Sequence, residues 1–150
     1  MTLRDARAED EAFVLSLVPR FVEHGIAGGH TREEVIAGTS RVLREALHHP
    51  QRGDVFLIAE DGRGERAGFV YAVTHRDFFT GERYAHVSEI AAARSGAGAG
   101  GALMEAVERW SREHGYRMVT LNVVDENAAA QRFYERRGYA LGHRHYVKRL

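Results

Sequence analysis

The feature that most restricts the fold of this 150-residue chain is a glycine-rich run between a strand-like and a helix-like segment. The strand-like segment is Tyr84 to Ala92, the run is Gly96 to Gly101, and helical spacing of apolar residues resumes at Leu103. Glycine allows positive φ angles and a close approach of backbone N–H groups to a ligand. The start of a helix adds unpaired amides and the positive end of its dipole. The run therefore predicts a binding site for an anion such as a phosphate group.

Two residue types narrow the chemistry of this site. Lys148 is the only lysine, and Gly101 is followed by Ala102. A P-loop needs a lysine directly after its glycines, so that class of phosphate site is excluded. The chain has no cysteine, which excludes disulfides, thiolate nucleophiles and cysteine zinc sites.

The remaining composition is that of an ordinary globular protein, and we expect a single domain over residues 1–150. Twenty-one basic residues balance twenty-one acidic ones, which gives no reason to expect nucleic acid or a membrane surface as partner. The charged N-terminus lacks an apolar signal core, so we expect a cytoplasmic protein. No His-x-x-x-His pair accompanies an acid, and we expect no metal.

Hydrophobic spacing predicts alternating strands and helices along the chain. The expected order is a strand at 3–6, a helix from about 9 to 21 that Pro19 kinks or ends, a helix from the capping box at Thr31 to about 49, strands at 55–60, 67–74 and 84–92, a helix after Gly101, a strand at 116–124, a helix at 127–137 and a strand at 143–148. This order indicates a mixed, twisted α/β sheet with helices on both faces.

The glycine run has a second interpretation, the dinucleotide fingerprint G-x-G-x-x-G. Gly96, Gly98 and Gly101 satisfy it, and Asp125 stands where a ribose-binding acid would lie. That fingerprint belongs to the first strand of a βαβ array, and the 49 residues after Gly101 are too few for such a domain. A glycine turn without any ligand is a third interpretation.

A second motif, Asn127 to Tyr139 (NAAAQRFYERRGY), favours a phosphate-binding loop over the dinucleotide fingerprint and over a turn without a ligand. Together with the glycine run it resembles the GNAT superfamily of acetyl-CoA-dependent N-acetyltransferases, which pair a glycine-rich pyrophosphate loop with an N-x-x-A-x-x-[FL]-Y-x-x-x-G-[FY] helix. The resemblance is specific from Ser88 to Tyr139. It implies a GNAT-like sheet in the order β-α-α-β-β-β-α-β-α-β-β.

The resemblance also implies a set of site residues for acetyl-CoA. The backbone of Ile90 and Ala92 would pair with the pantetheine arm like an added strand. Asn127 would hydrogen-bond that arm, and Tyr134 would give a proton to the departing thiolate. The amides that would hold the pyrophosphate belong to Ala97, Gly98, Ala99, Gly100, Gly101 and Ala102.

The loop departs from the family pattern in two ways. The family usually has arginine or glutamine three residues before Gly98, where this chain has Ser95, with Arg94 one place early. The passage from Ala92 to Gly96 is also about two residues short. Both departures predict a weaker hold on the cofactor.

Acetyl transfer requires a neutral amine, and an alkylamine with a pKa near 10 is mostly protonated at pH 7. Glu89 is the first candidate for the base that removes a proton from the amine, either directly or through a water chain. The alternative is that Glu89 is only a surface or ion-paired carboxylate. Weaker candidates are Asp77, Glu82 and His86. Tyr134 has a plain alternative as well, because an aromatic residue beside Phe133 often only packs.

We therefore expect an N-acetyltransferase that moves an acetyl group directly to a primary amine in a ternary complex, since no cysteine is available for an acyl-enzyme. The alternatives are a non-catalytic acyl-CoA-binding or sensing protein and an NAD-binding Rossmann-type oxidoreductase. The sequence does not identify the acceptor, for which a small polar amine is the first guess. Phe78 and Phe79 could wall its pocket or lie in a dimer contact, and family members are often homodimers.

Overall fold

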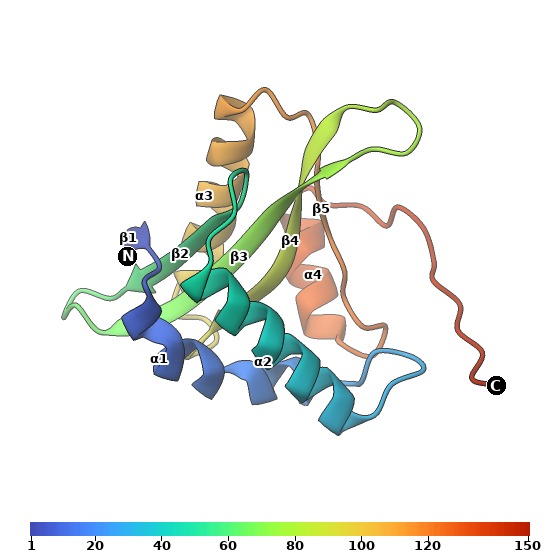
Figure 1. The fold of residues 1–150 in the computed structure, drawn as a ribbon, viewed down its shortest axis with the longest axis horizontal. Coiled ribbons are helices and arrows are strands. Elements are labelled where there is room, and N and C mark those ends of the chain that lie inside the picture. The colour runs from blue at the N-terminus through green and yellow to red at the C-terminus, as the bar shows by residue number, and fades with distance from the viewer.

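A five-stranded sheet is the centre of the computed structural model, which describes residues 1–150 (Figure 1). Its strands are β1 (Thr2–Asp5), β2 (Val55–Glu60), β3 (Arg66–Arg76), β4 (Arg83–Ala92) and β5 (Val119–Leu121). They lie in the order β1-β2-β3-β4-β5. Neighbouring strands among the first four are antiparallel, and β5 is parallel to β4. The expected mixed sheet is confirmed, whereas a Rossmann sheet of parallel strands is not present.

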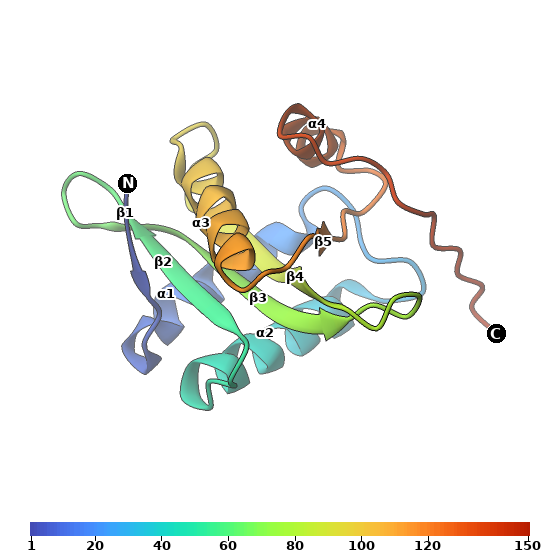
Figure 2. The same cartoon turned by 90° about the horizontal axis from the view of Figure 1, so that it is seen from above.

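Helices cover both faces of this sheet (Figures 1 and 2). The helices are α1 (Glu11–Ser16), α2 (Arg32–His48), α3 (Ala99–Glu113) and α4 (Ala128–Arg136), and two short 3₁₀ helices are η1 (Ala8–Asp10) and η2 (Val18–Val22). On one face, α1, η2 and α2 pack on a core that contains Leu43, Phe69 and Tyr71. On the other, α3 packs on Val70 and Val87, and α4 adds Phe133.

Local signals explain where the first helices begin and end. Pro19 lies in the first turn of η2, so the helix expected up to residue 21 is divided into α1 and a 3₁₀ turn. The capping box of α2 is present, because Thr31 Oγ1 accepts from the Glu34 N–H at 3.1 Å. The Glu34 carboxylate accepts from the Thr31 N–H at 3.4 Å.

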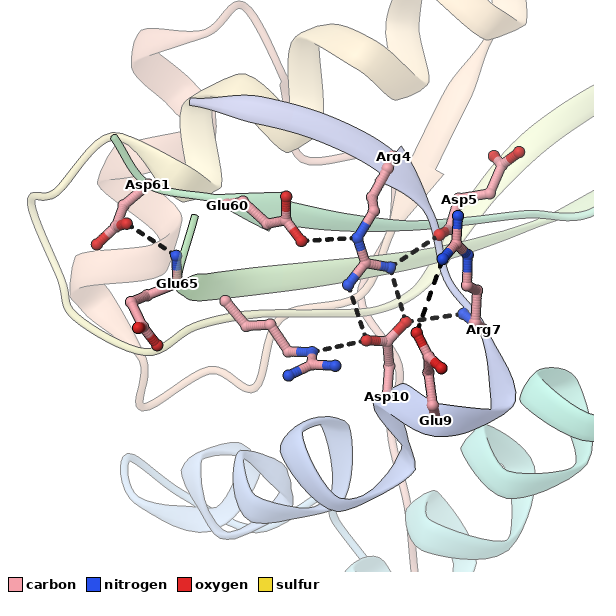
Figure 3. Close-up of polar contacts among 9 residues, drawn as sticks. Arg4, Asp5, Arg7, Glu9, Asp10, Glu60, Asp61 and Glu65 are labelled. Atoms are coloured by element: carbon pink, nitrogen blue, oxygen red, sulfur yellow. Dashed lines mark hydrogen bonds and ion pairs between the residues drawn. The ribbon is translucent and has the colours of Figure 1, made fainter. Parts of the chain in front are cut away.

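A buried carboxylate ties the first strand and helix to the sheet (Figure 3). The side chain of Asp10 is fully buried and accepts hydrogen bonds from Arg4 Nη1 and Nη2, both at 2.9 Å. It also accepts from Arg66 Nε at 2.6 Å and from the Arg7 N–H at 2.8 Å. Arg4 in turn donates from Nε to Glu60 at 2.7 Å. The hydrogen bond from Arg4 is the largest cause that holds the pKa of Asp10 far below its usual range.

The C-terminal part of the chain differs from the sequence-based expectation. No strand forms at 143–148, so the two strands expected after α4 are absent, and residues 137–150 contain neither helix nor strand. The alternating pattern there finds no neighbouring strand, and Tyr146 is 84% exposed. The strand expected at 116–124 is reduced to β5, because it pairs with β4 over three residues only. None of the helices combines the length and the apolar composition needed to cross a membrane.

Candidate functional site

The glycine run forms a tight turn and then the first turn of a helix. After β4 the chain passes through residues 93–98, and α3 already begins at Ala99 with Gly98 as its N-cap. Gly96 (φ 77°) and Gly98 (φ 88°) adopt the left-handed conformation that glycine tolerates best. The turn is therefore shorter than Gly96–Gly101, since the last three residues of that range belong to the helix.

The start of α3 presents unpaired backbone donors. In an α-helix the first N–H groups have no acceptor within the helix, and here they include those of Ala99, Gly100 and Gly101. The prediction fails for Ala102, because its N–H donates to the Gly98 carbonyl at 3.1 Å. Residues 93–98 are exposed, so an anion has access to the amides of Ala97 and Gly98.

The two glycines in the first turn of α3 lie near residues of the second motif. A Cβ at Gly100 would lie 3.6 Å from the Phe133 ring, and one at Gly101 would lie 3.2 Å from Arg137 Nη1. Arg137 Nη2 donates to the Gly101 carbonyl and to Glu105, both at 3.0 Å. A Cβ at Gly101 would thus meet only the guanidinium end of the Arg137 side chain, which follows α4.

One edge of β4 is unpaired next to this turn. The β4–β5 ladder ends at the pair Val87 and Leu121, while β4 continues to Ala92. The N–H of Ala93 donates to Ala67 in β3 at 2.8 Å. Because alternate residues of a strand point their backbone groups to opposite sides, those of Ile90 and Ala92 point away from β3. These are the two positions for which backbone pairing is expected.

Glu89 lies in β4 at a β-bulge, on the face that α2 covers. It pairs in register with Tyr71, whereas the next pair is Ala72 with Val87, so Ser88 is the extra residue of the bulge. Burial raises the pKa of Glu89 to about 7. None of the side-chain hydrogen bonds or ion pairs of the structure involves its carboxylate. Glu89 is therefore not the ion-paired carboxylate that was the alternative to a catalytic base.

Polar aromatic side chains continue this face along β3 and β4. His75 and His86 stack at 5.1 Å between ring centroids, and Tyr84 meets His75 edge-on at 5.8 Å. His86 Nδ1 lies 2.8 Å from Thr120 Oγ1, and burial followed by the neighbouring His75 lowers the pKa of His86. His86 therefore carries little charge at pH 7 and lies on the same face as Glu89.

The tip of the β3–β4 hairpin does not contribute to this face. Asp77 Oδ1 accepts from the N–H groups of Phe79 and Thr80 at 3.0 and 2.8 Å, which closes the turn. Glu82 accepts from Arg117 Nη2 at 2.6 Å. Both carboxylates thus have structural partners. Phe78 and Phe79 are 92% and 90% exposed, so they wall no pocket within this chain.

Two residues of the second motif, Tyr134 and Asn127, are positioned by α4. Tyr134 and Ile90 both pack against the buried cluster under α3. Burial raises the pKa of Tyr134 to about 12, and no hydrogen bond of the structure involves its hydroxyl. Asn127 is the N-cap of α4, where its side-chain oxygen accepts from the Ala130 N–H at 3.1 Å. The amide nitrogen of Asn127 is left to donate elsewhere.

Arg20 is a site residue that sequence reasoning missed. It lies in η2, and its guanidinium donates from Nη1 to the carbonyls of Ala92 and Ala93, the second at 2.8 Å. Nη2 donates to Ser95 Oγ at 3.3 Å. No local motif marks Arg20, since its partners are more than 70 positions away in the sequence.

Solved structures with this architecture share almost the full length of the chain. A protein from Pyrococcus furiosus assigned to the acetyl transferases is 25% identical, with a TM-score of 0.77 and 99% of each chain covered. A ribosomal-protein-alanine N-acetyltransferase from Brucella melitensis is 18% identical, with a TM-score of 0.71 and full coverage of both chains. An aminoglycoside 6′-N-acetyltransferase from Acinetobacter baumannii is 14% identical, with a TM-score of 0.72, over 99% of this chain and 97% of that one.

Comparison with curated protein sequences gives no significant match. The family profile described as "Acetyltransferase (GNAT) family" matches residues 23–139, which include the glycine turn, Glu89 and the whole of α4. With this match over most of its length, the chain belongs to the GNAT family of acetyltransferases.

Proposed function

We propose that this protein is a single-domain enzyme that transfers an acetyl group from acetyl-CoA to a primary amine, most simply of a small molecule. The observation that carries the proposal is the unpaired edge of β4 at Ile90 and Ala92, directly before the exposed turn 93–98 and the unpaired amides that open α3. An extended arm followed by a pyrophosphate fits these two features in that order. Acetyl-CoA has such a shape and supplies the activated acetyl group as a thioester.

The residues proposed to hold acetyl-CoA are drawn from both features. Backbone groups of Ile90 and Ala92 bind the pantetheine arm, and the free amide nitrogen of Asn127 donates to the same arm. The pyrophosphate accepts from the amides of Ala97, Gly98, Ala99, Gly100 and Gly101. Ala102 is left out because its amide is already bonded within the helix.

Glu89 and Tyr134 divide the proton transfers of the proposed reaction. The carboxylate of Glu89 takes a proton from the attacking amine as the new C–N bond forms. The Tyr134 hydroxyl gives its proton to the sulfur as the C–S bond breaks, so coenzyme A leaves as a thiol. Burial raises the pKa of Tyr134, and the same loss of solvation raises the proton affinity of a thiolate beside it.

Two observations support an amine as the acceptor. The ribosomal-protein-alanine and aminoglycoside enzymes with this fold are both N-acetyltransferases by name. In this chain, Glu89 and the weakly basic His86 lie on the α2 face of β4 and offer a negative charge without a competing cation. An ammonium group would be attracted to Glu89, and after it loses one proton to solvent the neutral amine attacks and gives its second proton to Glu89.

The proposal is tested with a panel of amines. The purified protein is incubated with acetyl-CoA and, in turn, an aminoglycoside, a polyamine, free amino acids and a peptide with a free N-terminus, and release of the coenzyme A thiol is followed. We expect acceptor-dependent release with one class and a product whose mass is increased by one acetyl group. Absence of release with every class, in protein that binds acetyl-CoA, would contradict the proposal.

Replacement of Glu89 by glutamine removes the proposed base. In the wild-type enzyme kcat should rise with pH, reach half of its plateau at about 7 and level off above that, since the carboxylate acts only when ionised. In Glu89→Gln we expect kcat to fall about a hundredfold and the rise near pH 7 to disappear. The measurement is kcat from pH 5.5 to 9 with saturating substrates. An unchanged profile would assign that rise to another group.

The stability of the same variant provides the control. A carboxyl whose folded pKa is raised contributes stability in its protonated form, below its ordinary value of 4.5, and this contribution is lost as the pH rises through about 7. Glu89→Gln should therefore unfold at the same or a higher temperature than the wild type at pH 8. A lower temperature would show that the loss of activity comes from misfolding.

A further inference from the structure

The side chain of Arg20 joins η2 to the segment between β4 and α3. Its Nη1 group bonds the two consecutive carbonyls of Ala92 and Ala93, and Nη2 reaches Ser95 Oγ. Arg20 Nε lies 3.8 Å from Glu23, and the Arg20 side chain is 29% exposed. Arg20 is the only side chain in the structure that donates a hydrogen bond to residues 93–98.

This segment has few other restraints. Its backbone bonds are one at each end, from the Ala93 N–H to Ala67 at 2.8 Å and from the Ala102 N–H to the Gly98 carbonyl at 3.1 Å. Between them lie two glycines with positive φ, in an exposed stretch. Such a loop loses much conformational entropy when a ligand orders it, unless another group has already restricted it.

The direction of the Ala92 carbonyl determines which backbone groups of the β4 edge are left for a ligand. The carbonyl points away from β3, toward the unpaired edge, where it accepts a hydrogen bond from Arg20. An incoming arm is thus left with the Ala92 N–H and both backbone groups of Ile90. Arg20 marks the point where strand pairing ends and the amide-lined turn begins.

We infer that Arg20 is a positioning residue that pre-orders the turn Ala93–Gly98 for the pyrophosphate of the donor. The hydrogen bonds from Arg20, which lies in η2, restrain the turn where Ser95 replaces the usual arginine or glutamine of the family. This inference rests on the proposed function for its ligand. Arg20 contacts no reacting atom, so it should govern the affinity for the donor and not the chemical step.

The first test compares two acetyl donors. In Arg20→Ala the KM for acetyl-CoA should rise about tenfold to a hundredfold, the scale of losing hydrogen bonds to a charged group, with kcat nearly unchanged. S-acetylpantetheine lacks the pyrophosphate, so kcat/KM with that donor should stay within about twofold of the wild type. Arg20→Lys, which keeps the charge but cannot span two carbonyls and Ser95, should recover only part of the affinity.

The second test needs no ligand. Arg94 is an exposed trypsin site inside the turn, and cleavage after it releases a fragment of defined mass. In Arg20→Ala this cleavage should be about fivefold faster or more at unchanged melting temperature, because the turn opens more often. Arg7→Ala, at an arginine 68% exposed with a single 3.7 Å ion pair, is the matched control.

The outcomes separate this inference from the proposed function. Failure of the wild-type protein to bind acetyl-CoA contradicts the proposed function, and cleavage at Arg94 then still tests the ordering of the turn. Equal losses with both donors, or an unchanged rate of cleavage at Arg94, would overturn the role of Arg20. A lowered melting temperature in Arg20→Ala would also overturn it, in favour of a general structural role.

Discussion

Replacing Tyr134 with phenylalanine should lower kcat about a thousandfold, within the range typical of removing a general acid. The change deletes one hydroxyl, and that hydroxyl bonds nothing in the protein. The ring keeps its place beside Phe133 at 5.1 Å and Tyr139 at 5.8 Å between centroids. The measurement is the initial rate with saturating acetyl-CoA and the amine identified in the panel.

Tyr139→Phe is the matched control for this prediction. Its hydroxyl donates to Glu108 Oε1 at 3.0 Å, so its loss should cost about 1 kcal/mol of unfolding free energy with little effect on kcat. Tyr134→Phe should show the reverse, full stability and low activity. Activity close to that of the wild type in Tyr134→Phe would leave Tyr134 as a packing residue only.

Replacing Asp10 with alanine should have the largest effect on stability. The carboxylate is fully buried and accepts four hydrogen bonds, two of them from Arg4 and one from Arg66. Breaking a buried ion pair by removing one partner typically costs about 3–5 kcal/mol. Here Arg66 would lose its carboxylate partner, and Arg4 would keep only Glu60. For a chain of this size the melting temperature should fall by roughly 10 to 15 °C.

The pH dependence of stability checks the cause. The pKa of Asp10 is lowered in the folded protein, so its contribution is present above the ordinary value of 3.8 and is lost as the pH falls toward the folded value. Asp10→Asn should remove this part of the acid sensitivity. Glu9→Ala is the control, since Glu9 is 66% exposed and its loss should cost within about 0.5 kcal/mol. A fall of less than 3 °C in Asp10→Ala would contradict the account.

Sequence patterns predicted those parts of the fold that local chemistry determines. The capping box at Thr31 and the break at Pro19 depend on a few neighbouring residues, and both are present. The strand, glycine turn and helix from β4 to α3 were also predictable, because the change in hydrophobic period and the glycines occupy adjacent positions. The order of these elements then indicated the mixed sheet.

The rest depends on contacts between distant parts of the chain. The residues 143–148 alternate like a strand but have no neighbouring strand, so they form none. The contacts of Gly100 with Phe133 and of Gly101 with Arg137 join distant positions of the chain, so no local pattern predicts them. The hydrogen bond from Arg20 to the Ala92 carbonyl and the absence of a partner for the Glu89 carboxylate also depend on the assembled sheet, so the sequence alone could not predict them.

Binding of the donor tests the central claim most directly. The melting temperature of the purified protein is compared with and without acetyl-CoA, free coenzyme A and NAD. A ligand at a hundredfold excess over its Kd adds about 2.7 kcal/mol, which corresponds to roughly 5 to 10 °C for this chain. We expect such a shift with acetyl-CoA and none with NAD. A shift with NAD alone, or none with any of the three, would contradict the assignment of the β4 edge and the α3 amides to acetyl-CoA.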